Sequence, residues 1–213
     1  MHVFKEAMIF GTAGFTAALS ISKLEHNNIG PESGEILVTG ATGGVGSFAV
    51  SMLAKLGYRV VASTGKETEK EYLYELGAKD IISREEVFNG IIRPLDQQLW
   101  AGAIDPVGGE PLASILSKIQ YGGSVAVSGL TGGMALPTSV HPFILRGVNL
   151  LGVDSVYCPM ETRLVIWNRL ATDLKPANLL NFVHKTVSLE ALPDTLPDIL
   201  NSKIRGRILV EIS

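Results

Sequence analysis

The chain contains a single cysteine, Cys158, among its 213 residues. One cysteine excludes an internal disulfide framework and a zinc site built from several thiolates. The four histidines show no metal-ligand spacing; they are His2, His26, His141 and His184. We therefore expect no bound metal, and we interpret Cys158 as a small apolar core residue rather than a nucleophile.

Charge is also scarce, because Asp, Glu, Lys and Arg make up only 18% of the residues, against about a quarter in an ordinary soluble domain. The formal net charge of -3 argues against a nucleic acid or an anionic membrane as partner, and against an RNA-binding or purely structural role. A hydrophobic share of 46% excludes a disordered chain. A surface so poor in charge predicts that part of it is covered by another domain or partner.

An uncharged run near the N-terminus, residues 7–22, follows Glu6 and is diluted by glycine and threonine. It falls short of the roughly 18 to 20 apolar residues that a membrane span requires. No small-residue cleavage site follows it, as a signal peptide would need. We therefore expect a buried helix in a soluble, cytoplasmic protein.

From Glu35 onward, short β-branched runs alternate with helical segments, which is typical of a parallel sheet covered by helices. Strands are expected at 36–38, 59–62, 80–83, 100–107, 124–128 and 148–153, and helices at 43–56, 67–76, 85–95, 110–119 and 142–146. Six such strands predict an α/β fold with a doubly wound parallel Rossmann sheet.

Beyond Asp154 the pattern changes to a helix at 161–173, a strand at 186–189, a helix at 194–201 and a strand at 207–212. The first of these helices carries an apolar stripe of Leu164, Val165, Trp167 and Leu170. The final strand–helix–strand tail is too small to enclose a core of its own. We expect residues 1–175 to form a nucleotide-binding domain with a leading helix, and residues 176–213 to be the return segment of a second domain whose main body lies outside this chain.

A glycine-rich turn follows the first expected strand and opens the next helix, reading Thr42, Gly43, Gly44, Val45, Gly46 after Ala41. Glycines at such a turn let the backbone approach a pyrophosphate, which the free N–H groups at the helix N-terminus then hold. A tight helix entry without a ligand would need the same residues, but the six surrounding strands favour nucleotide binding.

The end of the second strand indicates which nucleotide binds. NAD enzymes place an acidic residue there for the ribose hydroxyls, whereas this chain has Ser63, Thr64 and Lys66. Two hydroxyls and a lysine suit the 2′-phosphate of NADPH, although Glu67 keeps NADH as an alternative. Arg84 is expected either on the adenosine side of the cofactor or as a solvated charge paired with a neighbouring glutamate.

The turn also satisfies the Thr-Gly-x-x-x-Gly-x-Gly pattern of short-chain dehydrogenases. Those enzymes use Tyr-x-x-x-Lys, in which the lysine lowers the pKa of the tyrosine for proton transfer. None of the five tyrosines in this chain has a lysine four positions later. That family is therefore excluded.

With these residues considered, the chain resembles the medium-chain dehydrogenase/reductase superfamily, specifically its zinc-free quinone oxidoreductases and their acrylyl-CoA reductase branch. The likeness covers essentially the whole chain. The matching pieces are 14–17, the glycine turn, 62–66, 76–78, 104–109, 145–147, 151–155 and 206–207. The main departure is that an N-terminal GroES-like domain, which family members carry, is expected to be lacking, so that the tail belongs to an incomplete copy of that domain.

By position, the resemblance implies that Thr16 lies by the nicotinamide, that Gly129 and Leu130 line its pocket, and that Arg207 reaches the cofactor from the tail. The alternatives are a helix hydroxyl bonded to its own backbone, a plain turn and a surface cation, and they stay open. No catalytic proton donor is identified.

The resemblance also implies the chemistry, which is hydride transfer from NADPH to the β-carbon of an activated double bond, followed by protonation of the α-carbon. The substrate would be a small molecule such as an enoyl thioester, an enone or a quinone. A homodimer is expected, paired through the edge strand at 148–153. The alternative is a non-catalytic NADPH-binding module, or a truncated relic, that needs a separate catalytic half.

Overall fold

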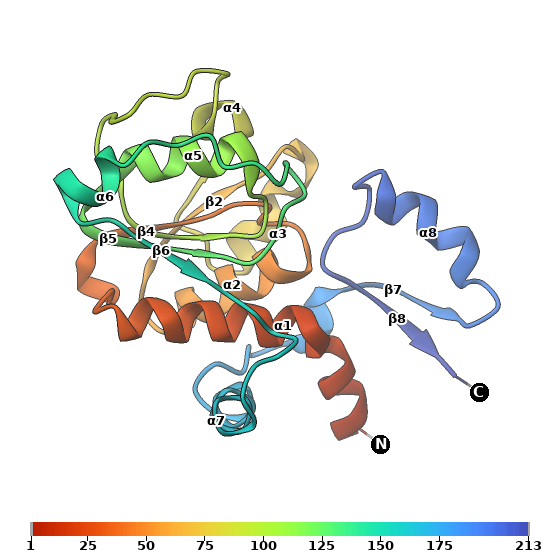
Figure 1. Cartoon of the computed structure of the whole chain (residues 1–213). Helices are drawn as coiled ribbons and strands as arrows, with labels where there is room; N and C mark the ends of the chain where they lie inside the picture. The colour runs from red at the N-terminus through yellow and green to blue at the C-terminus, as the bar shows by residue number, and fades with distance from the viewer. Residues whose placement is uncertain (1, 213) are drawn as a thin grey trace.

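The computed structural model describes residues 2–212, and its main body is one parallel sheet with helices on both faces (Figure 1). The sheet has six strands in the order β3-β2-β1-β4-β5-β6. Their bounds are β1 (Glu35–Val38), β2 (Arg59–Ser63), β3 (Asp80–Ile82), β4 (Trp100–Asp105), β5 (Ile119–Val127) and β6 (Asn149–Gly152). Every neighbouring pair is parallel. This strand order confirms the doubly wound sheet.

Two helical layers enclose the sheet. On one face pack α1 (His2–His26), α2 (Gly44–Lys55) and α3 (Lys70–Glu75), with α7 (Met160–Ala171) on the outer side of α1. On the other face lie α4 (Arg84–Val87), α5 (Gly109–Lys118) and α6 (His141–Arg146). Three 3₁₀ turns complete the domain: η1 (Pro31–Ser33), η2 (Glu67–Glu69) and η3 (Leu179–Phe182). The central strand β1 is apolar on both faces, since Ile36, Leu37 and Val38 are fully buried.

The leading helix α1 contains the uncharged run at 7–22 and is kinked at Gly11. Its segment Phe4–His26 is long and apolar enough to cross a membrane by length and composition, yet 67% of its most apolar window is buried. Phe15, Ile21 and Leu24 are essentially inaccessible in the core. The helix is therefore a core element of this domain, as its sequence predicted.

A second, smaller unit projects beside the sheet domain (Figure 1). It consists of β7 (Val183–Ser188), α8 (Leu192–Leu200) and β8 (Arg207–Glu211), and its two strands are parallel. Its helix exposes several large apolar side chains, among them Leu196, Ile199 and Leu200. The unit is anchored just before β7, where the Phe182 ring stacks on Phe48 of α2 with centroids 4.2 Å apart.

Two sequence predictions were wrong in detail. The helix expected at 85–95 is limited to α4, because the backbone becomes extended at Phe88 and adopts a positive φ of 89° at Gly90. On α7, Leu164 and Val165 are exposed. The other two residues of the expected stripe do contact the core, since Leu170 is buried and the Trp167 ring lies 5.7 Å from the Phe15 ring. Ile166 is buried as well, and it shares one side of the helix with Leu170, four residues later.

Two strand boundaries also differ from those expected from the sequence. The strand expected at 100–107 ends at Asp105, and the one expected at 124–128 begins at Ile119. Shifts of a residue or two at element ends are ordinary, but the early start of β5 is larger and includes two exposed positions, Tyr121 and Gly122.

We predict that Gly46→Ala destabilises the fold by about 1–3 kcal/mol, a typical cost of overpacking. A Cβ at Gly46 would lie 2.3 Å from the carbonyl oxygen of Gly40, so the helix would have to move away from the turn. Urea unfolding followed by circular dichroism measures the loss. Gly30→Ala is the control, since a Cβ there meets no atom within 4 Å. Equal effects of the two changes would contradict the prediction.

Candidate nucleotide-binding site

The carboxyl ends of β1, β2, β4 and β5 lie along one edge of the sheet, because all these strands are parallel. The chain reverses its direction of winding between β1 and β4, which are neighbours in the sheet. In doubly wound folds the ligand crevice opens at this switch point. The turns that follow these strands hold most of the candidate residues named from the sequence.

The glycine turn connects β1 to α2 in the expected way. The Gly43 amide donates to the Gly40 carbonyl at 2.9 Å, and the first helical bond runs from the Ser47 amide to the Gly43 carbonyl at 2.9 Å. The amides of Gly44, Val45 and Gly46 therefore fall in the first turn of α2, where a helix provides no intrahelical acceptor. Gly46 packs directly on the Gly40–Ala41 backbone, which brings the helix N-terminus close to the sheet edge.

Arg207, the first residue of β8, reaches this turn from the smaller unit. A Cβ built on Gly11 or on Gly44 would lie 3.0 Å or 3.1 Å from its guanidinium nitrogens, so the side chain lies against both glycines. Its Nε is buried and has no hydrogen-bond partner among the described residues. Burial also lowers the pKa of Arg207. A desolvated cation beside a helix N-terminus creates a strongly positive site that suits a pyrophosphate.

The end of β2 places the predicted polar residues together. Ser63 and Thr64 are buried, and the Ser63 hydroxyl donates to the Ser83 carbonyl at 3.3 Å. Thr64 Oγ1 accepts from the Lys66 amide at 3.0 Å. Burial lowers the pKa of Lys66, and the nearby positive charge of Arg84 lowers it further.

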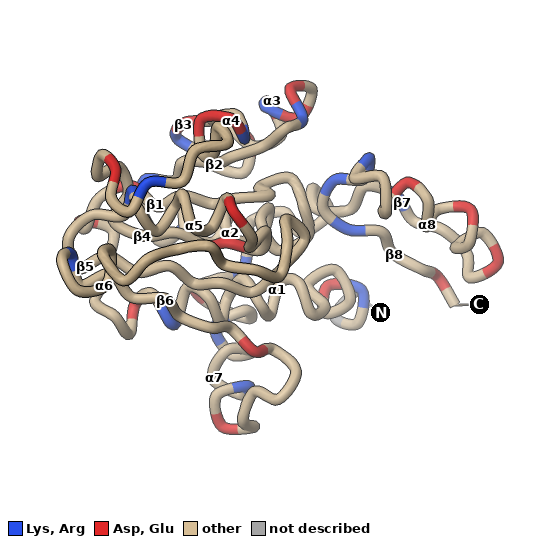
Figure 2. Tube along the Cα trace, turned by 45° about the horizontal axis from the view of Figure 1, so that its top comes forward, with Lys and Arg blue, Asp and Glu red and all other residues tan. Residues whose placement is uncertain are grey.

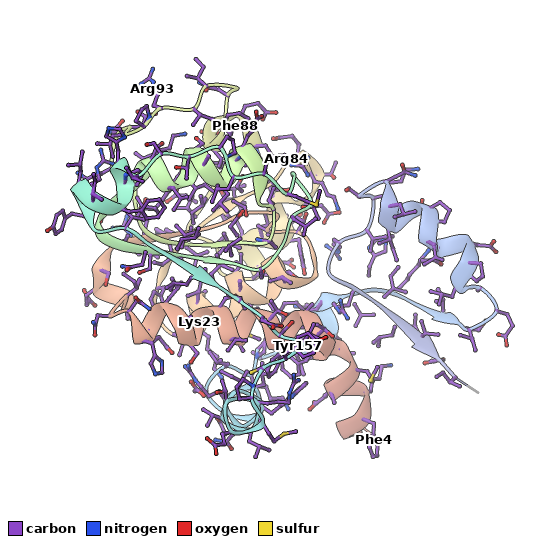
Figure 3. All side chains as sticks on the ribbon, in the orientation of Figure 1. Phe4, Lys23, Arg84, Phe88, Arg93 and Tyr157 are labelled. Carbon is purple, nitrogen blue, oxygen red and sulfur yellow. The ribbon has the colours of Figure 1, made fainter. Side chains whose placement is uncertain are left out.

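Arg84 lies close to the same strand end. A Cβ on Gly65 would be 2.7 Å from its Nε, and Figure 3 shows Arg84 at the end of the sheet domain that faces the smaller unit. No ion pair to Glu85 or Glu86 is formed by Arg84 among the described residues. Two cations thus flank the position where the adenosine end of a dinucleotide would rest.

Gly129 and Leu130 follow β5 and pack against the loop after β4. A Cβ on Gly129 would lie only 2.1 Å from the Pro106 carbonyl oxygen, and the Gly132 amide donates to the Val107 carbonyl at 2.7 Å. The Leu130 side chain lies on the surface of these two packed loops and is 61% exposed. Its exposure leaves an apolar side chain free to contact a bound ring.

Thr16 lies within α1 and is buried, and its hydroxyl donates to the Thr12 carbonyl at 2.7 Å. This is the helix-hydroxyl alternative described above. A role beside the nicotinamide stays a prediction.

Asp105, at the end of β4, is a residue of the site that sequence reasoning missed. It is fully buried and accepts hydrogen bonds from the Gly108 amide at 2.8 Å and the Val107 amide at 3.3 Å. The Thr39 hydroxyl at the end of β1 also donates to it. The carboxylate therefore fastens β1 to β4 at the switch point and shapes the loop after β4. The only signal in the sequence was its place in the run at 104–109.

Residues 44–170 match the family described as zinc-binding dehydrogenases. The chain belongs to that family. This confirms the resemblance to medium-chain dehydrogenases/reductases, since the match covers more than half of the chain.

Individual relatives support this family assignment. The acrylyl-CoA reductase AcuI of Ruegeria pomeroyi is 47% identical over 209 residues, which are 98% of this chain and 63% of the relative. The solved structure of Bacillus subtilis protein YhfP with NAD bound is 62% identical with a TM-score of 0.95, covering 98% of this chain and 63% of that one. The YhdH oxidoreductase of Salmonella enterica in complex with NADP is 50% identical with a TM-score of 0.93, covering 97% and 63%. This chain thus spans about 63–64% of the length of the three curated relatives that are 47–62% identical to it.

Zinc needs several His, Cys, Asp or Glu ligands gathered at one point. Within residues 2–212, no three His, Cys, Asp or Glu side chains gather as metal ligands would. Cys158 is half-buried against the core, and His141 is exposed with Nδ1 2.9 Å from the Ser139 hydroxyl. These residues do not fit a zinc centre.

We predict that Asp105→Asn gains stability relative to the parent chain as the pH rises from about 4 to about 8. Burial raises the pKa of Asp105 above its usual value, against the opposing hydrogen bonds from Thr39, Gly108 and Val107. The native state therefore holds this proton more tightly than the unfolded chain does. The carboxyl's contribution to stability is complete below its unfolded pKa and is lost as the pH rises through the higher folded pKa.

Urea unfolding across this pH range measures the effect, with Asp80→Asn as a control that removes the same charge from an exposed strand end. A stability difference between Asp105→Asn and the parent that does not change with pH would contradict the prediction.

Proposed function

We propose that the chain is the cofactor-binding part of an NADPH-dependent oxidoreductase that reduces the activated C=C bond of an enoyl thioester such as acrylyl-CoA, or of an enone or quinone. The observation that carries the cofactor assignment is Arg207. Its half-buried side chain lies against Gly44 at the N-terminus of α2, and its buried Nε has no partner in the described chain. An anion with several acceptor oxygens, such as a pyrophosphate, would accept hydrogen bonds from the Arg207 guanidinium and from the first-turn amides of α2.

The preference for the 2′-phosphate rests on the end of β2. Lys66 and Arg84 flank Gly65, and the buried Thr64 hydroxyl oxygen accepts from the Lys66 amide, which leaves its proton free to donate. No carboxylate occupies residues 62–66 to receive ribose hydroxyls. Similarity to solved relatives with NAD and with NADP bound supports a dinucleotide of either kind, so the charges at this strand end decide our choice.

Bound NADPH would supply the hydride, while this chain's residues would orient it. The α2 amides and Arg207 would hold the pyrophosphate, and Lys66 with Arg84 would hold the 2′-phosphate. The packed loops after β4 and β5, with Leu130 exposed on them, would form the wall behind the nicotinamide and exclude water. The substrate class is supported by the similarity to acrylyl-CoA reductase.

For the domain organisation, we propose that residues 176–213 complete a catalytic domain whose main body lies outside this sequence. Exposed apolar residues of α8 support this, because a soluble protein normally covers such a face. We further propose a soluble cytoplasmic homodimer paired through the edge strand β6, whose outer side has no neighbouring strand in the described chain. Sedimentation velocity tests the dimer.

The first test is a titration of the chain with NADPH and with NADH, followed by calorimetry. We expect tighter binding of NADPH than of NADH. We expect Lys66→Ala to weaken NADPH binding by at least about tenfold, since a hydrogen bond to a charged group contributes about 1.5–3 kcal/mol. NADH binding should change little. Lys79→Ala is the matched control, because Lys79 is exposed at the amino end of β3, the opposite edge of the sheet. Equal affinity for both nucleotides would overturn the cofactor assignment.

A second test separates the enzyme from the non-catalytic module. The nicotinamide absorbance of NADPH is followed after the addition of acrylyl-CoA or a benzoquinone to the purified chain. Oxidation of NADPH with multiple turnovers supports an enzyme in its own right. Binding of NADPH without turnover supports a cofactor module that needs a separate catalytic half.

A further inference from the structure

The segment that leads into β8 makes contact with the nucleotide site at consecutive residues. The Lys66 ammonium donates to the Ile204 carbonyl at 2.6 Å. The Gly206 amide donates to the Thr42 carbonyl of the glycine turn at 2.8 Å, and Arg207 lies against Gly44. Figure 2 shows basic residues gathered where this smaller unit meets the sheet domain. Ile204–Arg207 therefore forms a second wall of the candidate site.

Arg205 is the remaining residue of that wall, and it does not face the glycine turn. Its guanidinium lies over the Tyr72 ring, 4.4 Å from the centroid, and Nη1 lies 3.3 Å from Glu69 Oε2. The two side chains are 35% and 21% exposed, so the ion pair is more sheltered than an ordinary surface pair. The aromatic ring and the carboxylate together hold Arg205 in one place.

Glu69, the acidic partner of Arg205, lies one turn after Lys66, where its charge can affect a phosphate bound by Lys66. The Glu69 amide donates to the Lys66 carbonyl at 3.0 Å, and its negative charge acts to raise the pKa of the Lys66 amine. A carboxylate so close to Lys66 would repel a 2′-phosphate bound there. It would also offer an acceptor to unphosphorylated ribose, as the acidic residue of NAD enzymes does.

We propose that Arg205 is a specificity-determining residue for the cofactor, which acts by neutralising Glu69 and so keeps the end of β2 selective for a 2′-phosphate. Arg205 would not touch the cofactor itself. This inference rests on the proposed function, since it assumes NADP binding at Lys66. It assigns to the smaller unit a part in cofactor selection as well as in the architecture of the site.

The test compares the dissociation constants of NADP⁺ and NAD⁺ by calorimetry for the parent chain and four variants. Arg205→Met should weaken NADP⁺ by about three- to tenfold and leave NAD⁺ within about twofold, a size expected for a partly exposed charge pair. Glu69→Gln combined with Arg205→Met should restore the NADP⁺ affinity, because the repelling carboxylate is gone. Arg205→Lys keeps the charge and should retain most of the preference.

Lys203→Met is the matched control, because it removes one positive charge from the same segment at an exposed residue whose own ion pair is with Asp198 at 3.7 Å. An equal loss of NADP⁺ affinity in this variant would reduce the effect to overall charge and overturn the proposal. So would a double variant that stays as weak as Arg205→Met, since that result indicates structural damage.

The parent chain tests the proposed function independently of the variants. If it binds NADP⁺ no better than NAD⁺, the proposed cofactor preference fails, and the role of Arg205 fails with it. If the parent chain prefers NADP⁺ and Arg205→Met does not change the ratio of the two constants, the proposed function stands and only this inference falls.

Discussion

The contact between the backbone of the β1–α2 turn and Gly46 is the constraint on which the site depends. Only a residue without a Cβ allows the helix to sit against the Gly40 carbonyl, and this contact sets the position of the helix N-terminus. The first-turn amides then point to the edge of the sheet where the carboxyl ends of β1 and β4 meet. Thr39 and Asp105 fasten the same two strands together at this point. The turn and the switch point are therefore positioned by one set of contacts.

Electrostatics divides the site into two positive regions. Arg207 supplies one of them at the glycine turn. It forms no ion pair with an acidic residue in the described chain, and its Nε is buried without a hydrogen-bond partner there. Lys66 and Arg84 supply the other at the end of β2. Their order along the sheet edge, at the ends of β1 and β2, is the order of the pyrophosphate and the adenosine ribose in a doubly wound fold.

The smaller unit contributes to the nucleotide site in spite of its separate sheet. Phe182 anchors the chain on α2 before β7 begins. Gly206 and Arg207 return the chain to the glycine turn at the start of β8. The strand–helix–strand unit is thus attached at two points on the same side of the nucleotide domain. Any movement of this unit relative to the sheet would change the contacts of Lys66 with Ile204 and of Gly44 with Arg207.

The sequence by itself determined the sheet and the turn, because both are encoded locally. Buried parallel strands read as short β-branched runs, and the phosphate turn reads as glycines at a strand–helix junction. Local pattern also placed Ser63, Thr64 and Lys66 at one strand end. It failed at 88–95, where the backbone is extended at Phe88 and has a positive φ at Gly90, so the expected helix ends at Val87.

Only the tertiary structure decided the contacts between distant segments. Asp105 pairs with Thr39 across 66 residues, and Lys66 reaches Ile204 across 138. Neither pair leaves a periodic trace in the sequence, since each depends on how two strand ends or two units pack. The Arg205–Glu69 ion pair and the partial burial of Arg207 also bring together segments that are far apart in the sequence. Their chemistry depends on desolvation and proximity, which arise only when the whole chain has folded.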